Sequence, residues 1–242
     1  MTLLLLAGTT EAKQIAAGLK ARGIAAIASL AGVTRAPKPL DIETRTGGFG
    51  GADGFLQFIR DRQITAVIDA THPYAARITK RTADLCRSAG IPYLYVVRPA
   101  WVARLGDDWT QIIAEEDAAS LIPKGDTVFL GTGRQTLHRF AGLVGCRVIC
   151  RQIDPPNTPF PFKGGEFLIG RPPFPVDREK ALFKALGIDW LVVKNAGGDP
   201  SATKLTAARE LGIPVLMIAR PELPDAERVD NVSDALKWAE CL

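Results

Sequence analysis

A histidine and a tyrosine, His72 and Tyr74, directly follow a short apolar segment and stand just before a helical pattern. Both side chains can donate protons, and an imidazole titrates near neutral pH. Ligands of open parallel sheets bind at the carboxyl ends of the strands, so we expect both residues at a ligand edge. We predict that His72 and Tyr74 are catalytic and that Thr71 binds substrate, with a structural histidine as the alternative. His138 lies inside an expected helix and is assigned a structural role.

The turn after the first apolar segment, residues 3–7, has the composition of a phosphate site. Gly8 allows the backbone to approach a ligand, and Thr9 and Thr10 open a helix whose unpaired N–H groups and dipole attract a phosphate. Threonines stand where the G-x-G-x-x-G fingerprint has further glycines, so the fingerprint is incomplete. We predict that these three residues bind a cofactor. The alternative is a plain strand-to-helix turn with a threonine cap.

The end of the second expected strand favours NADPH over NADH. In dinucleotide folds an acidic residue binds the ribose 2′-hydroxyl of NAD at this place, whereas NADP sites have neutral and basic groups there. Ser29 cannot repel a 2′-phosphate, and Arg35 could pair with one. A solvated Arg35 is the alternative. The predicted cofactor-binding residues of this segment are Ser29, Leu30, Ala31, Gly32 and Arg35.

Four glycines surround a single aromatic residue in residues 46–51, TGGFGG. Glycine-rich backbone permits close approach of a ligand, and the ring of Phe49 could cover a flat molecule. We predict that Gly48 and Phe49 bind substrate. A flexible turn is the alternative.

In the second half of the chain, two glycine-containing segments with basic residues also follow apolar runs. Together with Arg171 and Arg220 they could form a basic rim for carboxylates or phosphates, although solvated loop charges would have the same pattern. The predicted substrate-binding residues of this half are Gly131, Thr132, Arg134, Lys194, Asn195 and Lys204.

The composition excludes several classes of protein. The 242 residues are 47% hydrophobic and 23% charged, with a net charge of +4 from dispersed basic residues, which predicts neither nucleic-acid nor membrane binding. The four cysteines are scattered and only two histidines occur, so no metal site is expected. The first residues are expected to form a buried strand, and a cytoplasmic location follows. Serine-hydrolase, P-loop and zinc-protease motifs are absent.

Apolar runs alternate with amphipathic helical segments, which predicts an α/β protein with two Rossmann-like, doubly wound parallel sheets. The alternation is interrupted near Pro99, so the predicted domains are residues 1–100, which bind NADPH, and residues 101–242, which contribute to the substrate site. Residues 154–171 are expected to be loop-rich because of their prolines and glycines. The expected strands are residues 3–7, 24–29, 66–70, 93–97, 127–130, 147–150, 190–193 and 215–218.

The ordered set of segments resembles the precorrin-6A reductase family of cobalamin biosynthesis, and the resemblance runs nearly end to end. The matching segments are LLLLAGTTEAKQIA, SLAG, GGFGG, DATHPYA, the R-P-x-W of residues 98–101, GTGR, and VVKNAGG with the following Lys204.

This resemblance implies an oxidoreductase that uses NADPH to reduce one double bond of precorrin-6A and gives precorrin-6B. It also implies two Rossmann-like domains with a ligand cleft between them, and an anionic tetrapyrrole substrate handed over by neighbouring enzymes of the pathway. Three alternatives stay open: a cobalt-precorrin-6A reductase, a tetrapyrrole methyltransferase, and a nucleotide-binding regulator without turnover, because a fold alone does not determine function.

Overall fold

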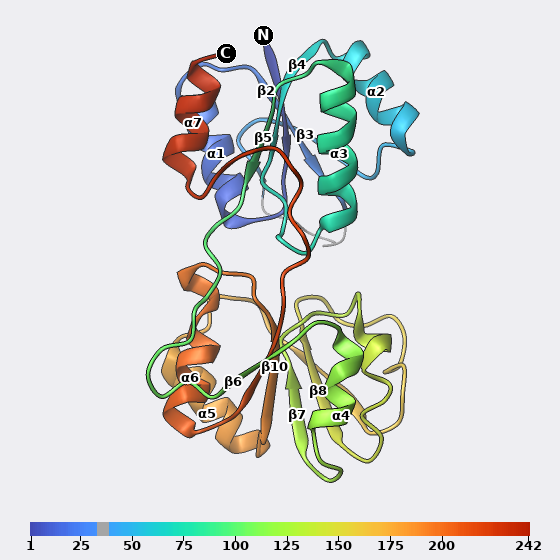
Figure 1. Ribbon diagram of the computed structural model, residues 1–242, viewed down its shortest axis with the longest axis vertical. Coiled ribbons are helices and arrows are strands. Elements are labelled where there is room, and N and C mark those ends of the chain that lie inside the picture. Colours follow the sequence, from blue (N-terminus) through green and yellow to red (C-terminus); the bar gives the residue numbers. More distant parts are fainter. Residues whose placement is uncertain (33–38) are drawn as a thin grey trace. The chain divides into compact units, whose positions relative to one another are not determined.

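The computed structural model describes residues 1–32 and 39–242 and divides them into two compact units. Unit 1 comprises residues 1–99 and 221–242, and unit 2 comprises residues 100–220. Each unit contains one six-stranded sheet flanked by helices (Figure 1). The strand pairs of both sheets are parallel, which confirms the predicted α/β class.

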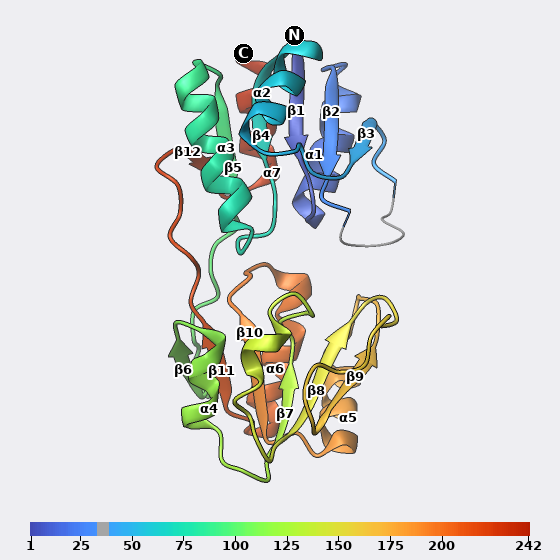
Figure 2. The same cartoon turned by 90° about the vertical axis from the view of Figure 1, so that its right-hand side faces the viewer.

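Unit 1 has the strand order β3-β2-β1-β4-β5-β12, which is the order of a dinucleotide-binding Rossmann sheet (Figure 2). Its strands are β1 (Thr2–Leu6), β2 (Ala26–Leu30), β3 (Glu43–Thr46), β4 (Ile64–Asp69), β5 (Tyr93–Val96) and β12 (Glu227–Val229). Its helices are α1 (Thr10–Ala21), α2 (Ala52–Asp61), α3 (Ala76–Ala89) and α7 (Val232–Glu240). Helices α1 and α7 cover one face of the sheet, and α2 and α3 cover the other (Figure 1).

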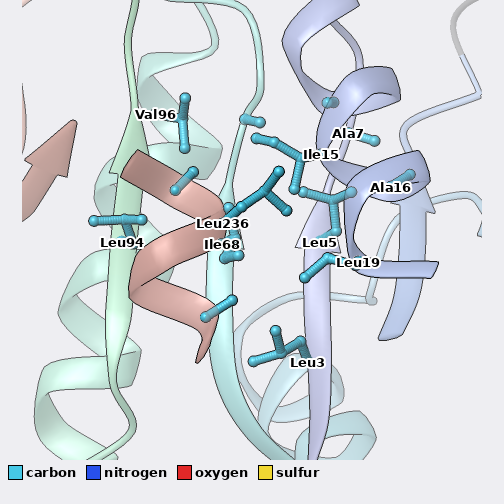
Figure 3. Packing of buried hydrophobic residues seen from close by; sticks show 14 of the residues in the cluster. Leu3, Leu5, Ala7, Ile15, Ala16, Leu19, Ile68, Leu94, Val96 and Leu236 are labelled. Atoms are coloured by element: carbon cyan, nitrogen blue, oxygen red, sulfur yellow. The ribbon is translucent and has the colours of Figure 1, made fainter. Parts of the chain in front are cut away.

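The core of unit 1 follows from the apolar strands, whose side chains are buried on both faces as expected for a parallel sheet. On one face, Leu5 of β1 packs with Ile15 of α1 and Leu236 of α7 (Figure 3). Helix α7 lies close to α1 because residue 18 is glycine: a Cβ there would lie 2.5 Å from a Leu236 methyl carbon.

Unit 2 repeats the same order as β9-β8-β7-β10-β11-β6. Its strands are β6 (Trp109–Ile112), β7 (Thr127–Leu130), β8 (Arg147–Gln152), β9 (Gly165–Ile169), β10 (Trp190–Lys194) and β11 (Val215–Ile218). Its α-helices are α4 (Ala118–Leu121), α5 (Val176–Leu186) and α6 (Thr203–Leu211), and its 3₁₀ helices are η1 (Glu115–Asp117), η2 (Leu137–Phe140) and η3 (Asp199–Ser201). Across the described parts of both units, no helix has the length and apolar character needed to span a membrane.

The structure differs from the predicted domain division at the C-terminal segment. Residues 221–242 were predicted in the second domain, but they belong to unit 1. The reason is that β12 pairs with β5, Val229 opposite Val96, and that the apolar side of α7 completes the core over β1 and α1. The predicted loop-rich segment 154–171 also contains a strand, β9, which pairs with β8.

The packing of α7 on unit 1 gives a first prediction. Replacing Leu236 with Ala should lower the free energy of unfolding by about 2–5 kcal/mol, because the residue is 6% exposed and its removal leaves a cavity. Chemical denaturation followed by circular dichroism would measure this loss. The control is Ser233→Ala, an exposed position on the same helix, which should change stability by less than about 0.5 kcal/mol. Equal effects of both substitutions would contradict the assignment of α7 to this core.

Candidate active site

The predicted site residues of unit 1 follow four adjacent strands, β4, β1, β2 and β3. All four strands are parallel, so the segments that leave them lie at one edge of the sheet. The chain direction across the sheet reverses between β1 and β4, which is the switch point where Rossmann sheets bind their ligands. The turn at Gly8 and the segment at His72 stand on the two sides of this switch point.

Thr9 connects these two segments. Its Oγ1 accepts a hydrogen bond from the backbone N–H of Ala12 at 3.1 Å and thereby caps α1. The same hydroxyl donates to the backbone oxygen of Ala70 at 2.7 Å. Apart from its chain neighbours, no atom of the described residues lies within 4 Å of a Cβ built on Gly8, so the space beside this glycine is open in that part of the chain. Thr10 is exposed as the first residue of α1.

A carboxylate in the first turn of α1 would repel an anionic ligand, but an arginine neutralises the charge of this carboxylate. Glu11 accepts from the guanidinium of Arg98 at 2.7 Å, with both side chains mostly buried. Arg98 belongs to the R-P-x-W segment, whose role the sequence did not indicate. The arginine therefore helps to keep this helix end suitable for a phosphate.

The segment after β4 forms a turn that places His72 beside Tyr74. The backbone N–H of Tyr74 donates to Nδ1 of His72 at 3.3 Å, and the ring centroids are 5.7 Å apart. The N–H of Ala75 donates to the backbone oxygen of His72 at 2.7 Å. Because Nδ1 is an acceptor here, the neutral imidazole carries its proton on Nε2.

A fully buried carboxylate, Asp69, lies at the base of this turn and was not predicted from the sequence. Its oxygens accept from the backbone N–H of Thr71 at 3.0 Å and from the hydroxyl of Tyr93 at 2.9 Å. The hydroxyls of Thr71 and Thr79 lie 3.2 Å apart. Thr71, predicted to bind substrate, therefore belongs to the support of the turn.

Burial raises the pKa of Asp69, although the hydrogen bonds from Thr71, Tyr93 and Thr79 oppose the shift. Burial and the neighbouring Asp69 also raise the pKa of the Cys86 thiol, to about 12, and that of the Tyr93 hydroxyl. The thiol and the phenol thus stay protonated at neutral pH, so the cluster holds at most one negative charge, on Asp69.

Ser29, predicted to bind the cofactor, is a buried residue next to the last position of β2. Its hydroxyl accepts a hydrogen bond from an arginine that was not predicted as a site residue. Arg45 of β3 is directly opposite Ser29 in the sheet and donates to its Oγ at 2.7 Å. The guanidinium also donates to the backbone oxygens of Gly47 and Gly48, each at 2.9 Å. Arg35, the predicted basic partner, lies outside the described residues.

Phe49, which was predicted to bind substrate, contacts Arg45 and two other phenylalanines within the chain. Its ring lies beneath the Arg45 guanidinium, 4.1 Å from ring centroid to Cζ, and meets Phe55 and Phe58 edge-on. Gly48 also faces Arg45, through its backbone oxygen. The glycine-rich segment therefore holds the arginine at the sheet edge. Of the other residues predicted here, Leu30 ends β2 and is partly buried, and Ala31 and Gly32 are exposed.

In unit 2, Lys194 ends β10 and lies in a charged cluster. Its Nζ donates to Oγ1 of Thr136 at 3.2 Å and lies 3.5 Å from the buried carboxylate of Glu115, which also meets Arg139 at 3.3 Å. Burial lowers the pKa of Lys194 against the raising effect of Glu115. Burial alone would raise the pKa of Glu115, but Thr136, Lys194 and Arg139 hold it below its ordinary value.

Asn195, another predicted substrate-binding residue, follows Lys194 and holds the backbone of Trp101. Its side-chain amide accepts from the backbone N–H of Trp101 at 2.8 Å and donates to the backbone oxygen of the same residue at 3.0 Å. Lys204 lies over the indole of Trp101, 5.3 Å from Nζ to centroid, and its methylenes approach Gly131. The structure thus brings Gly131, Asn195 and Lys204 together.

The remaining basic residues of the predicted rim differ in their surroundings. Arg220 donates to the backbone oxygen of Asn195 at 2.8 Å and so joins this group. Arg171 is half-exposed and pairs with Asp154 at 3.3 Å. Arg134 is exposed in the segment after β7, where Thr132 is partly buried, and His138 is exposed on η2.

The strand order and the glycine turn at the switch point define a Rossmann-type α/β protein with two such units. A profile of the family described as "Precorrin-6x reductase CbiJ/CobK" matches residues 2–240. The chain is 45% identical over 243 aligned positions to the precorrin-6A reductase of Rhodococcus erythropolis, with 99% of this chain and 98% of that protein covered. It is 28% identical to the cobalt-precorrin-6A reductase of Priestia megaterium, with 91% of each covered.

The solved structure described as "CobK precorrin-6A reductase" superimposes with a TM-score of 0.94 at 36% identity, covering 100% of this chain and 96% of that one. The chain belongs to the CbiJ/CobK family of precorrin-6x reductases, as its ordered segments predicted.

The buried Asp69 gives a prediction on pH. A carboxyl group whose pKa is raised by folding contributes stability below its unfolded pKa, and this contribution is lost as the pH rises through the folded pKa. Asp69→Asn cannot ionise, so its melting temperature relative to wild type should increase as the pH is raised from about 4, the ordinary pKa of an aspartate, through the neutral range. Thermal melts of both proteins across this range would measure the difference. The matched variant Asp53→Asn, at an exposed carboxylate, should show no such rise. A flat difference for Asp69→Asn would contradict a raised pKa.

Proposed function

We propose that this protein catalyses the NADPH-dependent reduction of a double bond of precorrin-6A to give precorrin-6B in cobalamin biosynthesis. Family membership supports the reaction. The observation that carries the choice of cofactor is the pairing of Ser29 with Arg45 at the end of β2. A neutral and a basic residue at this place favour a cofactor with a 2′-phosphate over one with a 2′-hydroxyl.

The turn between β1 and α1 fits the pyrophosphate of such a cofactor. The open space at Gly8 admits the ligand, while Thr9 caps the helix and leaves the first N–H groups of α1 for phosphate oxygens. The pair of Glu11 and Arg98 removes the charge that would repel it. Gly8, Thr9 and Thr10 are the pyrophosphate residues of this proposal.

Arg45 fits the 2′-phosphate. A guanidinium has five N–H groups, and the three hydrogen bonds of Arg45 go to neutral oxygens. No carboxylate within the described ranges lies in ion-pair distance of it. A phosphate dianion would therefore meet an oriented and uncompensated positive charge. Arg35 remains a second candidate partner for this phosphate.

At the switch point, His72 and Tyr74 line the reacting centre. The bound nicotinamide supplies the hydride for the double bond. A proton must then reach the neighbouring atom of the substrate. The imidazolium form of His72 supplies it from Nε2 and returns to the neutral form, in which Nδ1 accepts from the N–H of Tyr74. Asp69 keeps the turn in place from below through the backbone of Thr71.

In unit 2, the basic residues Lys194, Lys204 and Arg134 bind carboxylates of the anionic tetrapyrrole, with Gly131 and Thr132 allowing close approach. Asn195 contributes by holding Trp101 rather than by direct contact. Transfer of the substrate from neighbouring pathway enzymes is part of the same proposal. A metal-free macrocycle is favoured over a cobalt-containing one, because the identity to the Rhodococcus precorrin-6A reductase is 45% and that to the Priestia cobalt-precorrin-6A reductase is 28%.

The cofactor assignment is tested by titration and turnover. The wild-type protein should oxidise NADPH only when precorrin-6A is present. The loss of NADPH absorbance measures this oxidation. Arg45→Met should raise the Kd for NADPH by about 10- to 100-fold, because a charge-assisted interaction is lost, and should change the Kd for NADH little. The control Arg60→Met removes an exposed arginine of α2 and should leave both constants unchanged. Equal wild-type affinity for both cofactors would overturn the 2′-phosphate argument, and absence of turnover would leave the regulator as the better interpretation.

The role of His72 is tested by single-turnover kinetics. His72→Ala should slow reduction by about 100-fold or more, the usual contribution of a general acid, with the Kd for NADPH unchanged. The second histidine provides a matched control, since His138→Ala should react at the wild-type rate. An undiminished rate in His72→Ala would remove the imidazole from the mechanism.

A further inference from the structure

Gln152, the last residue of β8, has a buried side-chain amide without a hydrogen-bond partner among the described residues. The residue is 7% exposed, and neither Oε1 nor Nε2 is paired within that part of the chain. Its backbone is regular, because the backbone oxygen accepts from the N–H of Gly170 at 2.9 Å and continues the sheet ladder. The unpaired groups are therefore those of the side chain alone.

An unpaired amide is unfavourable in the interior, and buried polar groups in native proteins nearly always have a partner. The packing of β8 does not require a polar side chain at position 152. Val148 and Cys150, which precede Gln152 on the same face of the strand, are buried, so the pattern would accept an apolar side chain at the third position. A polar residue at a position where the packing would accept an apolar one points to a hydrogen-bond partner that is not part of the chain.

The position of Gln152 is at the ligand edge of unit 2. Leu130 of β7 is paired with Cys150 on one side and with Val192 on the other, so these three residues share a face. Gln152 and Lys194 are the next residues on that face and end their strands at the same edge. β7 lies between their strands, so their backbones are about 10 Å apart.

We infer that Gln152 is a substrate-binding residue that donates from Nε2 to a carboxylate of the tetrapyrrole, beside the carboxylate-binding lysine Lys194. This inference rests on the proposed function. The neutral amide supplies a directional donor through Nε2. Its Oε1 accepts a hydrogen bond from a water molecule that also hydrates the bound carboxylate. Such a donor adds no charge to a cluster in which Glu115 already pairs with Lys194.

This assignment predicts opposite effects on stability and on binding. Gln152→Leu removes the unpaired amide at similar volume, so the substrate-free protein should melt at a higher temperature than wild type. The same variant should bind precorrin-6A about tenfold more weakly and show a raised KM with little change in kcat, because the lost contact is made before and during the reaction. An amide satisfied by a buried structural water would behave in the reverse way, with a lower melting temperature and an unchanged KM.

The experiment combines thermal melts without ligand, absorbance titration of precorrin-6A without cofactor, and steady-state kinetics. Gln152→Glu provides a second variant, since its carboxylate should repel the substrate and raise the KM above that of Gln152→Leu. The matched control Gln111→Leu makes the same change at an exposed position of β6 and should alter neither affinity nor KM. The Kd for NADPH should be the same in all four proteins.

The outcomes separate this inference from the proposed function. Suppose that the wild-type protein binds and reduces precorrin-6A, but that Gln152→Leu has an unchanged affinity for it or a lower melting temperature. This result would overturn the assignment of Gln152 alone. Wild type that neither binds nor reduces precorrin-6A would overturn the proposed function and this assignment with it.

Discussion

Parallel pairing is the constraint from which the arrangement of this protein follows. A strand can pair in parallel with a neighbour only after the chain has returned to the starting side, so each return adds a segment that covers a face of the sheet. The same geometry brings every carboxyl end to one edge. Residues far apart in the chain, such as Thr9 and Ala70, thereby come within hydrogen-bond distance. The bond between them joins the two sides of the switch point.

At the carboxyl ends of the strands, some charged side chains are paired with an opposite charge and others are held by neutral groups. Glu11 is neutralised by Arg98 in the first turn of α1, and Glu115 is balanced by Lys194 and Arg139 in unit 2. Arg45 is held by neutral oxygens and an aromatic ring instead, so its charge stays available to an anion. Within unit 1, the neutralised Glu11 and the uncompensated Arg45 leave a positive charge at the sheet edge, which is what the proposed cofactor site requires.

Local patterns predicted much of this architecture, whereas features that depend on pairing between distant segments were not predicted. The glycine turn at Gly8 and the end of β2 at Ser29 can be read from a few neighbouring residues. Arg45 could not, because its place opposite Ser29 depends on the register of two strands joined through a long connection. β12 has three residues, two of them exposed, and therefore lacks an apolar signal. Gln152 departs from the apolar alternation of β8, but only its unpaired amide in the structure gives that departure a meaning.

The two sheets differ in the origin of the strand at their sixth position. In unit 2 this strand is β6, which pairs with β11 and belongs to the same continuous segment, whereas in unit 1 it is β12, which follows unit 2 in the chain and pairs with β5. During synthesis on the ribosome, the N-terminal domain of a protein usually completes its folding first. In this chain, the unit that contains the N-terminus is the second to have all its residues. Unit 2 has all its residues once position 220 has been made, whereas unit 1 must wait for α7, with the partner edge of β5 exposed until then.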